Sequence, residues 1–196
     1  MPKSEALPRR WDALEIIADA FQREPIVVTL GGTTRELAAM RRSASHLYVL
    51  DSMGLPPAIG LGLALGLEDS RFEKVVVLEG DGSLLMGFST LPTIGLTRPE
   101  KLVLIVLDNA AYSATGNQPT ASSVVDFCAT ALACGMEARE VEDLAGLRSA
   151  LDWAKATPGP LMIRLHTSTE AASVPFLLED PVVLGGAFAD YVARNK

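Results

Sequence analysis

The chain has 196 residues, of which 48% are hydrophobic and 21% are charged, and its formal net charge at pH 7 is −7. This composition excludes an intrinsically disordered chain, because it supplies ample apolar surface for a core, and the length suits a single domain over residues 1–196. Nucleic acid is not an expected partner, because an acidic chain has no excess cations to neutralise phosphates.

Short apolar runs alternate with longer segments of helical character along the chain. The predicted elements are, in order, helix 12–21, strand 25–30, helix 33–40 with a threonine as its N-cap, strand 46–50, helix 53–67, strand 74–78, helix 84–96, strand 102–107, helix 124–134, helix 141–155, strand 161–165 and helix 187–194. The charged segment 137–143 is interpreted as a solvent-exposed junction between a strand and a helix.

Three of the predicted strands, 74–78, 102–107 and 161–165, lack alternating polar residues. Continuous apolar strands are typical of parallel sheets that are covered on both faces. Together with the alternation of strands and helices, this predicts an α/β fold with an open, doubly wound, mostly parallel sheet and helices on both faces.

The longest apolar segment, 53–67, is shorter than the roughly 20 residues that cross a bilayer, so we expect a buried helix and no membrane association. Cys128 and Cys134 do not have the spacing of a metal cluster and are expected to be buried free thiols. The N-terminal residues lack the apolar core of a signal peptide. These features predict a cytoplasmic protein.

Polar or glycine-containing segments follow four of the predicted strands, at residues 31–34, 51–54, 80–83 and 108–112. Ligands bind at the carboxyl ends of the strands in doubly wound sheets, where loops lead into helices. We therefore expect these four segments to form a ligand site.

The segment 80–83 has the composition of a phosphate and metal site. Two glycines flank Asp81, so the backbone can turn sharply and another group can approach closely. Ser83 falls at the start of a helix, where free N–H groups favour phosphate. Asp81 and Asn109 follow consecutive strands and offer hard oxygen ligands suited to Mg²⁺. Each feature alone is common in turns, and it is their combination that predicts a site.

This combination resembles the thiamine-diphosphate signature, GDG followed further along by NN. The resemblance extends over most of the chain and is to the diphosphate-binding (PP) domain of thiamine-diphosphate-dependent decarboxylases. The segments GDGSLLMGFSTLPTIG, LDNAAYSATGNQPT and TLGGTTREL are most similar to sulfopyruvate and phosphonopyruvate decarboxylases, in which the second of these reads NNGAHxSxGGQPT.

The resemblance implies a role for each matching residue. Asp81, Asn109 and the carbonyl of Ala111 would bind Mg²⁺. Met53 would support the bent form of thiamine diphosphate, and the Asp51 carbonyl would accept a hydrogen bond from its aminopyrimidine. The other positions implied to bind the cofactor are Gly32, Thr33, Thr34, Ser52, Gly80, Gly82, Ser83 and Tyr112.

Three positions depart from the family pattern. Asp108 replaces the first Asn of the pair, Ala111 replaces a glycine whose backbone carbonyl is a metal ligand, and Asn117 replaces a glycine of GGQPT. Ala111 is compatible with the role only if its φ is negative. The roles of Asp108 and Asn117 are open at this stage.

The resemblance also implies a missing part. In the family, a glutamate on a separate pyrimidine-binding domain activates the cofactor, and this chain has no room for a second domain of about 150 residues. We expect a split enzyme in which a pyrimidine-binding α subunit carries that glutamate, assembled as a dimer of heterodimers or larger. The reaction would be non-oxidative decarboxylation of a small 2-oxoacid, sulfopyruvate first and phosphonopyruvate as the alternative. Two further hypotheses are a subunit of a thiamine-diphosphate 2-oxoacid oxidoreductase or synthase, and a non-catalytic phosphate- or nucleotide-binding module.

Overall fold

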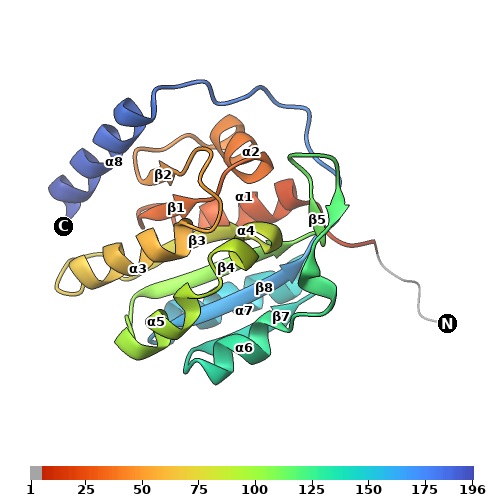
Figure 1. Ribbon diagram of the computed structural model, residues 1–196. Helices are drawn as coiled ribbons and strands as arrows, with labels where there is room; N and C mark the ends of the chain where they lie inside the picture. The colour runs from red at the N-terminus through yellow and green to blue at the C-terminus, as the bar shows by residue number, and fades with distance from the viewer. Residues whose placement is uncertain (1–5) are drawn as a thin grey trace.

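The computed structural model describes residues 6–196, and these form six parallel strands in one sheet covered by helices (Figure 1). The strand order is β2-β1-β3-β4-β8-β7. The predicted open, doubly wound α/β architecture is confirmed. The strands are β1 (Ile26–Val28), β2 (His46–Tyr48), β3 (Val75–Gly80), β4 (Leu102–Asp108), β7 (Glu137–Val141) and β8 (Leu161–His166).

Alternate residues of the central strands enter two separate cores, one on each face of the sheet. Val76 and Val103 belong to the core under α1 (Arg10–Ala20), α2 (Gly32–Met40) and α7 (Leu144–Ala156). Val77 and Leu104 belong to the opposite core. That second core lies under α3 (Pro56–Gly66), α4 (Asp81–Met86), α5 (Thr90–Thr97) and α6 (Phe127–Ala133). Because both faces are buried, the strands need apolar residues at every position.

The helix predicted over 84–96 is wrong in extent, because it is divided into α4 and α5 around Gly87. The backbone of Gly54 approaches so closely that a Cβ on Gly87 would lie 2.0 Å from the Gly54 carbonyl oxygen. Helix α4 begins earlier than predicted, at Asp81, directly after β3. Asp81 and Ser83 therefore both lie in the first turn of a helix.

The predicted threonine N-cap of α2 is also wrong. The N-cap is Gly31, whose φ of 73° favours glycine, and no side chain caps the helix. The Thr34 hydroxyl instead donates to the Thr29 carbonyl oxygen at 2.6 Å. This bond ties the start of α2 back to the end of β1.

The charged segment 137–143 is a strand rather than a junction, since residues 137–141 form β7 at the edge of the sheet. An edge strand keeps one side in water and tolerates charge there. Helix α7 follows, capped by Asp143, whose carboxylate accepts a hydrogen bond from the Gly146 N–H at 2.6 Å.

Two further features formed no part of the prediction. They are a two-stranded hairpin, β5 (Ala111–Tyr112) with β6 (Gln118–Pro119), and the single turn η1 (Ala121–Ser123).

After β8 the chain crosses to the opposite edge of the sheet, where α8 (Pro181–Asn195) packs beside β2 (Figure 1). This helix begins earlier than the predicted 187–194. Asp180 caps it by accepting a hydrogen bond from the Val182 N–H at 2.8 Å.

Both cysteines are free thiols, Cys128 buried and Cys134 half-buried. In the described part of the chain, no helix has both the length and the apolar character needed to span a membrane.

His46 predicts a pH dependence of stability. Burial, with a smaller contribution from the positive charge of Arg41, lowers the pKa of His46 from 6.5 to about 4. Below pH 6.5 the unfolded chain binds a proton that the folded chain binds only near pH 4. The free energy of unfolding should therefore fall by up to about 3 kcal/mol between these pH values.

Urea unfolding of wild type and His46→Gln at several pH values measures this contribution. The difference between the two proteins should change with pH over this range, and a constant difference would contradict the assignment.

Candidate functional site

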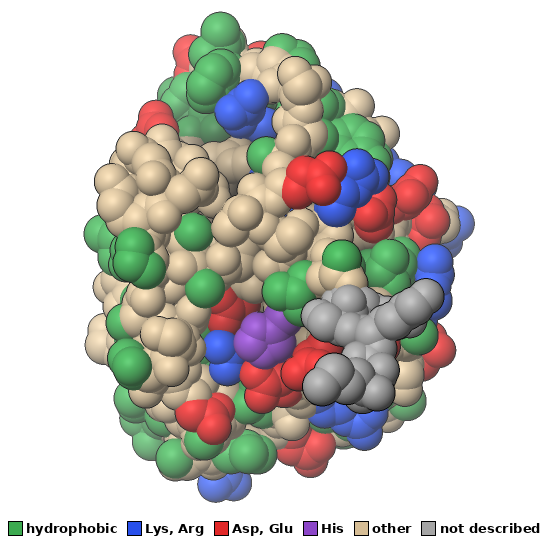
Figure 2. Space-filling view, turned by 90° about the vertical axis from the view of Figure 1, so that its right-hand side faces the viewer, with side chains coloured by type: hydrophobic (Ala, Val, Ile, Leu, Met, Phe, Trp, Pro, Cys, Tyr) green, Lys and Arg blue, Asp and Glu red, His purple; other side chains and the backbone are tan. Residues whose placement is uncertain are grey.

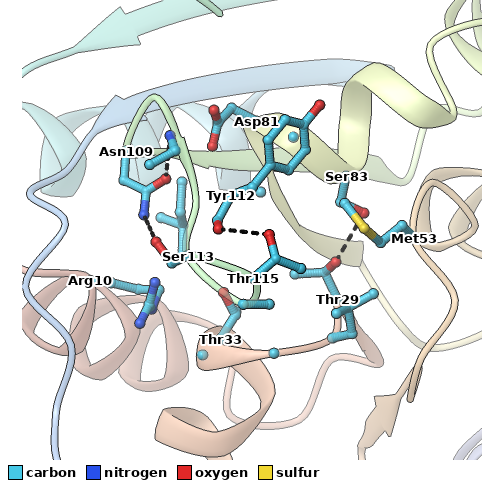
Figure 3. Close-up of a pocket in the computed structure, with 18 residues that line it drawn as sticks. Arg10, Thr29, Thr33, Met53, Asp81, Ser83, Asn109, Tyr112, Ser113 and Thr115 are labelled. Atoms are coloured by element: carbon cyan, nitrogen blue, oxygen red, sulfur yellow. Dashed lines mark hydrogen bonds between the residues drawn. The ribbon is translucent and has the colours of Figure 1, made fainter. Parts of the chain in front are cut away.

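A pocket lies at the carboxyl ends of β1, β3 and β4, on the face where the strands end (Figure 3). The chain leaves β1 toward β2 on one side and returns to form β3 on the other. This reversal is where doubly wound sheets open a crevice for ligands. The two charged residues among those lining the pocket are Arg10 and Asp81. Much of the surrounding face carries uncharged groups, with acidic and basic side chains gathered mainly toward its right and lower parts in Figure 2.

Ten of the thirteen predicted site residues line this pocket. They are Gly32, Thr33, Met53, Gly80, Asp81, Gly82, Ser83, Asn109, Ala111 and Tyr112. Three do not line it. Asp51 is exposed with a φ of 58°, Ser52 is half-buried, and Thr34 is buried with its hydroxyl bonded to the Thr29 carbonyl.

Asp81 lies at the base of the pocket and is 2% exposed. The Thr120 hydroxyl donates to its Oδ2 at 2.5 Å. Burial raises the pKa of Asp81, and the nearby Asp108 carboxylate raises it further, although the Thr120 hydrogen bond opposes this. A bound cation would stabilise the charged form of a buried carboxylate that has a second acid nearby.

The turn after β4 presents Asn109 and Ala111. Asn109 Oδ1 accepts a hydrogen bond from the Ala111 N–H at 3.1 Å, and its Nδ2 donates to Ser113 Oγ at 2.8 Å. The left-handed residue of the turn is Ala110, with a φ of 55°, and it stands at the glycine of the NNGAHxSxGGQPT pattern. Ala111 has a negative φ, so the condition for an alanine at this position is met.

The structure explains the aspartate that replaces the first Asn of the family pattern. Asp108 Oδ2 accepts hydrogen bonds from Arg164 Nε at 2.9 Å and Nη2 at 2.6 Å, and both side chains are buried. Asp108 Oδ1 accepts a hydrogen bond from the Ala110 N–H at 2.9 Å. Arg164 on β8 thus holds Asp108, and Asp108 holds the turn that carries Asn109.

Asn117, the third departure, has a φ of 58°. The Tyr112 carbonyl oxygen accepts hydrogen bonds from the N–H groups of Thr115, Gly116 and Asn117. This tight turn joins β5 to β6 and requires a left-handed residue, which asparagine adopts more readily than most residues. The replacement of glycine is therefore compatible with the loop.

The hairpin packs against α4 through Tyr112 and Gly82. A Cβ on Gly82 would lie 2.4 Å from Tyr112 Cε1. Glycine is thus required at position 82 by the neighbouring Tyr112 ring. Tyr112 and Asp81 line the same pocket, and Figure 3 shows the Tyr112 ring beside Asp81.

Ser83 joins three segments beneath the pocket. Its Oγ accepts hydrogen bonds from Thr29 Oγ1 at 3.2 Å and from the Gly54 N–H at 2.9 Å. Glu79 is fully buried beside this cluster, and burial raises the pKa of Glu79 to about 7, although the hydrogen bond that its Oε1 accepts from the Gly80 N–H opposes the shift. Glu79 Oε2 is buried without a hydrogen-bond partner among residues 6–196.

Gly31 also lines the pocket and belongs to the predicted segment 31–34. The lining residues outside the predicted segments are Arg10, Thr29, Leu30, Leu107, Ser113, Ala114 and Thr115. Arg10 comes from α1, which precedes every predicted ligand segment. Its proximity depends on how α1 packs, and no local pattern in the sequence signals it.

The donors in the pocket suit a hard cation with a phosphate group. Within residues 6–196 there is no cluster of three or more His, Cys, Asp and Glu side chains that could hold a metal. The available set is instead one carboxylate, one amide and backbone carbonyls, and Mg²⁺ accepts such oxygens together with phosphate oxygens. Asp81, Asn109 and Ala111 could supply these ligands.

Comparison with known proteins agrees with this geometry. A family model described as thiamine pyrophosphate enzyme, C-terminal TPP binding domain, matches residues 30–165. The chain belongs to this family.

This chain is also similar to several known proteins. Sulfopyruvate decarboxylase subunit beta of Methanococcus maripaludis is 35% identical, over 94% of this chain and 98% of the relative. Phosphonopyruvate decarboxylase of Streptomyces viridochromogenes is 41% identical, over 83% of this chain and 41% of the relative. Benzoylformate decarboxylase of Polynucleobacter necessarius shares the fold, with a TM-score of 0.70 and 21% identity over 84% of this chain and 34% of that one.

The ion pair behind the turn predicts strong coupling between two residues. Arg164→Met leaves Asp108 buried and unpaired, so the free energy of unfolding should fall by roughly 3–5 kcal/mol. Adding Asp108→Asn removes the unpaired charge and should restore most of the loss. Urea unfolding of the two single variants and the double variant measures this. Additive losses in the double variant would contradict the coupling.

Proposed function

We propose that this chain is the thiamine-diphosphate-binding subunit of a two-subunit 2-oxoacid decarboxylase, with sulfopyruvate as the substrate. The observation that carries the proposal is the correspondence in extent with sulfopyruvate decarboxylase subunit beta, 94% of this chain against 98% of that relative. The pocket supports it, because the matching residues converge at the edge of the sheet where a cofactor would bind.

Asp81, Asn109 and the Ala111 carbonyl would hold Mg²⁺. Gly82 and Ser83 lie in the first turn of α4, whose free N–H groups favour the oxygens of a diphosphate. Gly80 allows close approach on one side, and Gly32 and Thr33 line the other side. Thr34 would contribute through its bond to Thr29, which holds the loop after β1 in place.

Thiamine diphosphate, when bound, supplies a group that accepts the electrons released as CO₂ leaves the 2-oxoacid. Met53 lines the pocket and would support the bent form of the cofactor. Tyr112 would cover the diphosphate end from the hairpin. Asp51 and Ser52 lie outside the pocket of this chain, and we assign them to the pyrimidine end, at the boundary with a partner subunit.

The partner would be an α subunit that binds the pyrimidine ring and carries an activating glutamate, in a dimer of heterodimers or a larger assembly. Among the residues lining the pocket, Asp81 is the single acid, and it is assigned to the metal. Glu79 is fully buried and Glu36 is paired with Arg10, so neither is available to activate the cofactor. A cytoplasmic location is inferred from the two free thiols.

Phosphonopyruvate is the alternative substrate, favoured by the 41% identity to phosphonopyruvate decarboxylase. A synthase subunit is supported more weakly, by 30% identity to acetolactate synthase 2 of Nicotiana tabacum over 72% of this chain. A non-catalytic phosphate- or nucleotide-binding module is less favoured, because the matching family model is that of a thiamine pyrophosphate enzyme.

The metal assignment predicts the effect of Asp81→Ala. Removing the carboxylate should weaken Mg²⁺-dependent binding of thiamine diphosphate at least about tenfold, while the variant stays folded because the lost carboxylate was itself costly to bury. Calorimetric titration with cofactor measures this, with the exposed Asp152→Ala as a matched control. Unchanged affinity in a folded Asp81→Ala protein would exclude the metal role.

The proposed function is tested by reconstitution. The chain is assayed for CO₂ release with Mg²⁺, thiamine diphosphate and either sulfopyruvate or phosphonopyruvate, alone and with the candidate α subunit. Activity should require both proteins, and kcat/KM should be higher for sulfopyruvate. Release by the chain alone at the rate of the complex would refute the two-subunit assignment, and a preference for phosphonopyruvate would select the alternative substrate.

A further inference from the structure

Arg10 places a guanidinium group in the wall of the pocket. It is the first residue of α1, and its side chain is 8% exposed. It is the one basic side chain among the residues lining the pocket. Figure 3 shows it entering from α1 on the side opposite Met53 and Ser83, with Ser113 and Asn109 above it.

Glu36 fixes this guanidinium in position. Arg10 Nε donates to Glu36 Oε2 at 3.0 Å, and Nη2 donates to Oε1 at 2.7 Å. Glu36 is buried, and its Oε1 also accepts a hydrogen bond from the Ala172 N–H at 3.0 Å. A pair of parallel bonds of this kind holds the plane of the guanidinium as well as its place.

The loop after β1 is shaped around the same group. A Cβ on Gly32 would lie 2.4 Å from Arg10 Nη2. Glycine at position 32 therefore lets the loop after β1 lie directly against the Arg10 guanidinium. The path of this loop and the place of the guanidinium depend on one another.

Donors remain for a ligand after the bonds to Glu36 are counted. A guanidinium has five N–H groups, and Glu36 accepts from two of them. Nη1 has no hydrogen-bond partner within residues 6–196. A buried ion pair is weak evidence of a contribution to stability, so the fixed guanidinium with spare donors at the pocket wall suggests a binding role.

The place of Arg10 selects the ligand. Planar N–H pairs match the oxygens of phosphoryl and sulfonate groups. Arg10 lines the same pocket as Asn109, which is assigned to the metal that binds the diphosphate, and Figure 3 shows it on the side opposite Met53, which is assigned beneath the reacting part of the cofactor. We propose that Arg10, positioned by Glu36, binds the terminal phosphoryl group of the cofactor's diphosphate. This inference rests on the proposed cofactor site.

The test compares two cofactor forms that differ by that phosphoryl group. Calorimetric titration with Mg²⁺ gives the affinities of the full chain for thiamine diphosphate and thiamine monophosphate. Arg10→Gln combined with Glu36→Gln removes both charges together, so neither is left buried and unpaired. The double variant should bind thiamine diphosphate about ten- to a hundredfold more weakly and the monophosphate as wild type does.

Arg9→Gln is the matched control, because Arg9 is adjacent and equally charged but exposed and paired with Asp12 and Glu170. It should leave both affinities unchanged. Thermal unfolding checks that the double variant is folded. If it is not, Arg10→Lys keeps a charge opposite Glu36 without the planar fork, and it should show a smaller loss for the diphosphate alone.

Wild-type affinity for thiamine diphosphate in a folded Arg10 variant would overturn the inference while leaving the proposed function intact. An increase in KM for sulfopyruvate without a change in cofactor affinity would overturn it too, and would assign the guanidinium to the substrate's anion. If wild type binds no thiamine diphosphate, the cofactor site itself fails, and the inference fails with it.

Discussion

The parallel pairing of β1, β3 and β4 is the constraint on which the site depends. Parallel strands end at the same edge of the sheet, so the segments after them meet there although they are distant in the sequence. The change of direction at β1 separates the loop before α2 from the turn into α4 and opens the pocket between them. Every predicted ligand that lines the pocket reaches it from one of these segments or from the loop before α3.

Buried ion pairs then set the shape of this edge. Arg164 and Asp108 hold the turn that presents Asn109, and Arg10 and Glu36 lie against the loop at Gly32. Each pair joins elements that are far apart in the sequence. The energetic cost of burying two charges is offset when both are bonded, and the geometry of both side chains is then well defined.

Glycines let backbone segments around the pocket pack closely against their neighbours. Gly54 and Gly87 lie against one another, which ends α4 after six residues and brings the Gly54 N–H to Ser83. Gly82 accommodates the Tyr112 ring and so allows the hairpin to pack against α4. These contacts explain why the segment between β3 and β4 is two short helices instead of one long helix.

The sequence by itself indicated the fold class, because continuous apolar strands are typical of a sheet buried on both faces. Its GDGS and DN segments indicated the family through their resemblance to the thiamine-diphosphate signature. It also identified Asp81 and Asn109 as neighbours, since parallel strands end together. Only the tertiary structure decided the role of Asp108, the division at Gly87 and the presence of Arg10 in the pocket. Each of these depends on a contact between residues that are distant in the sequence. Asp108 contacts Arg164, Gly87 contacts Gly54, and Arg10 contacts Gly32. Local periodicity and motif spacing carry no information about such contacts, because they are created when the helices pack onto the sheet.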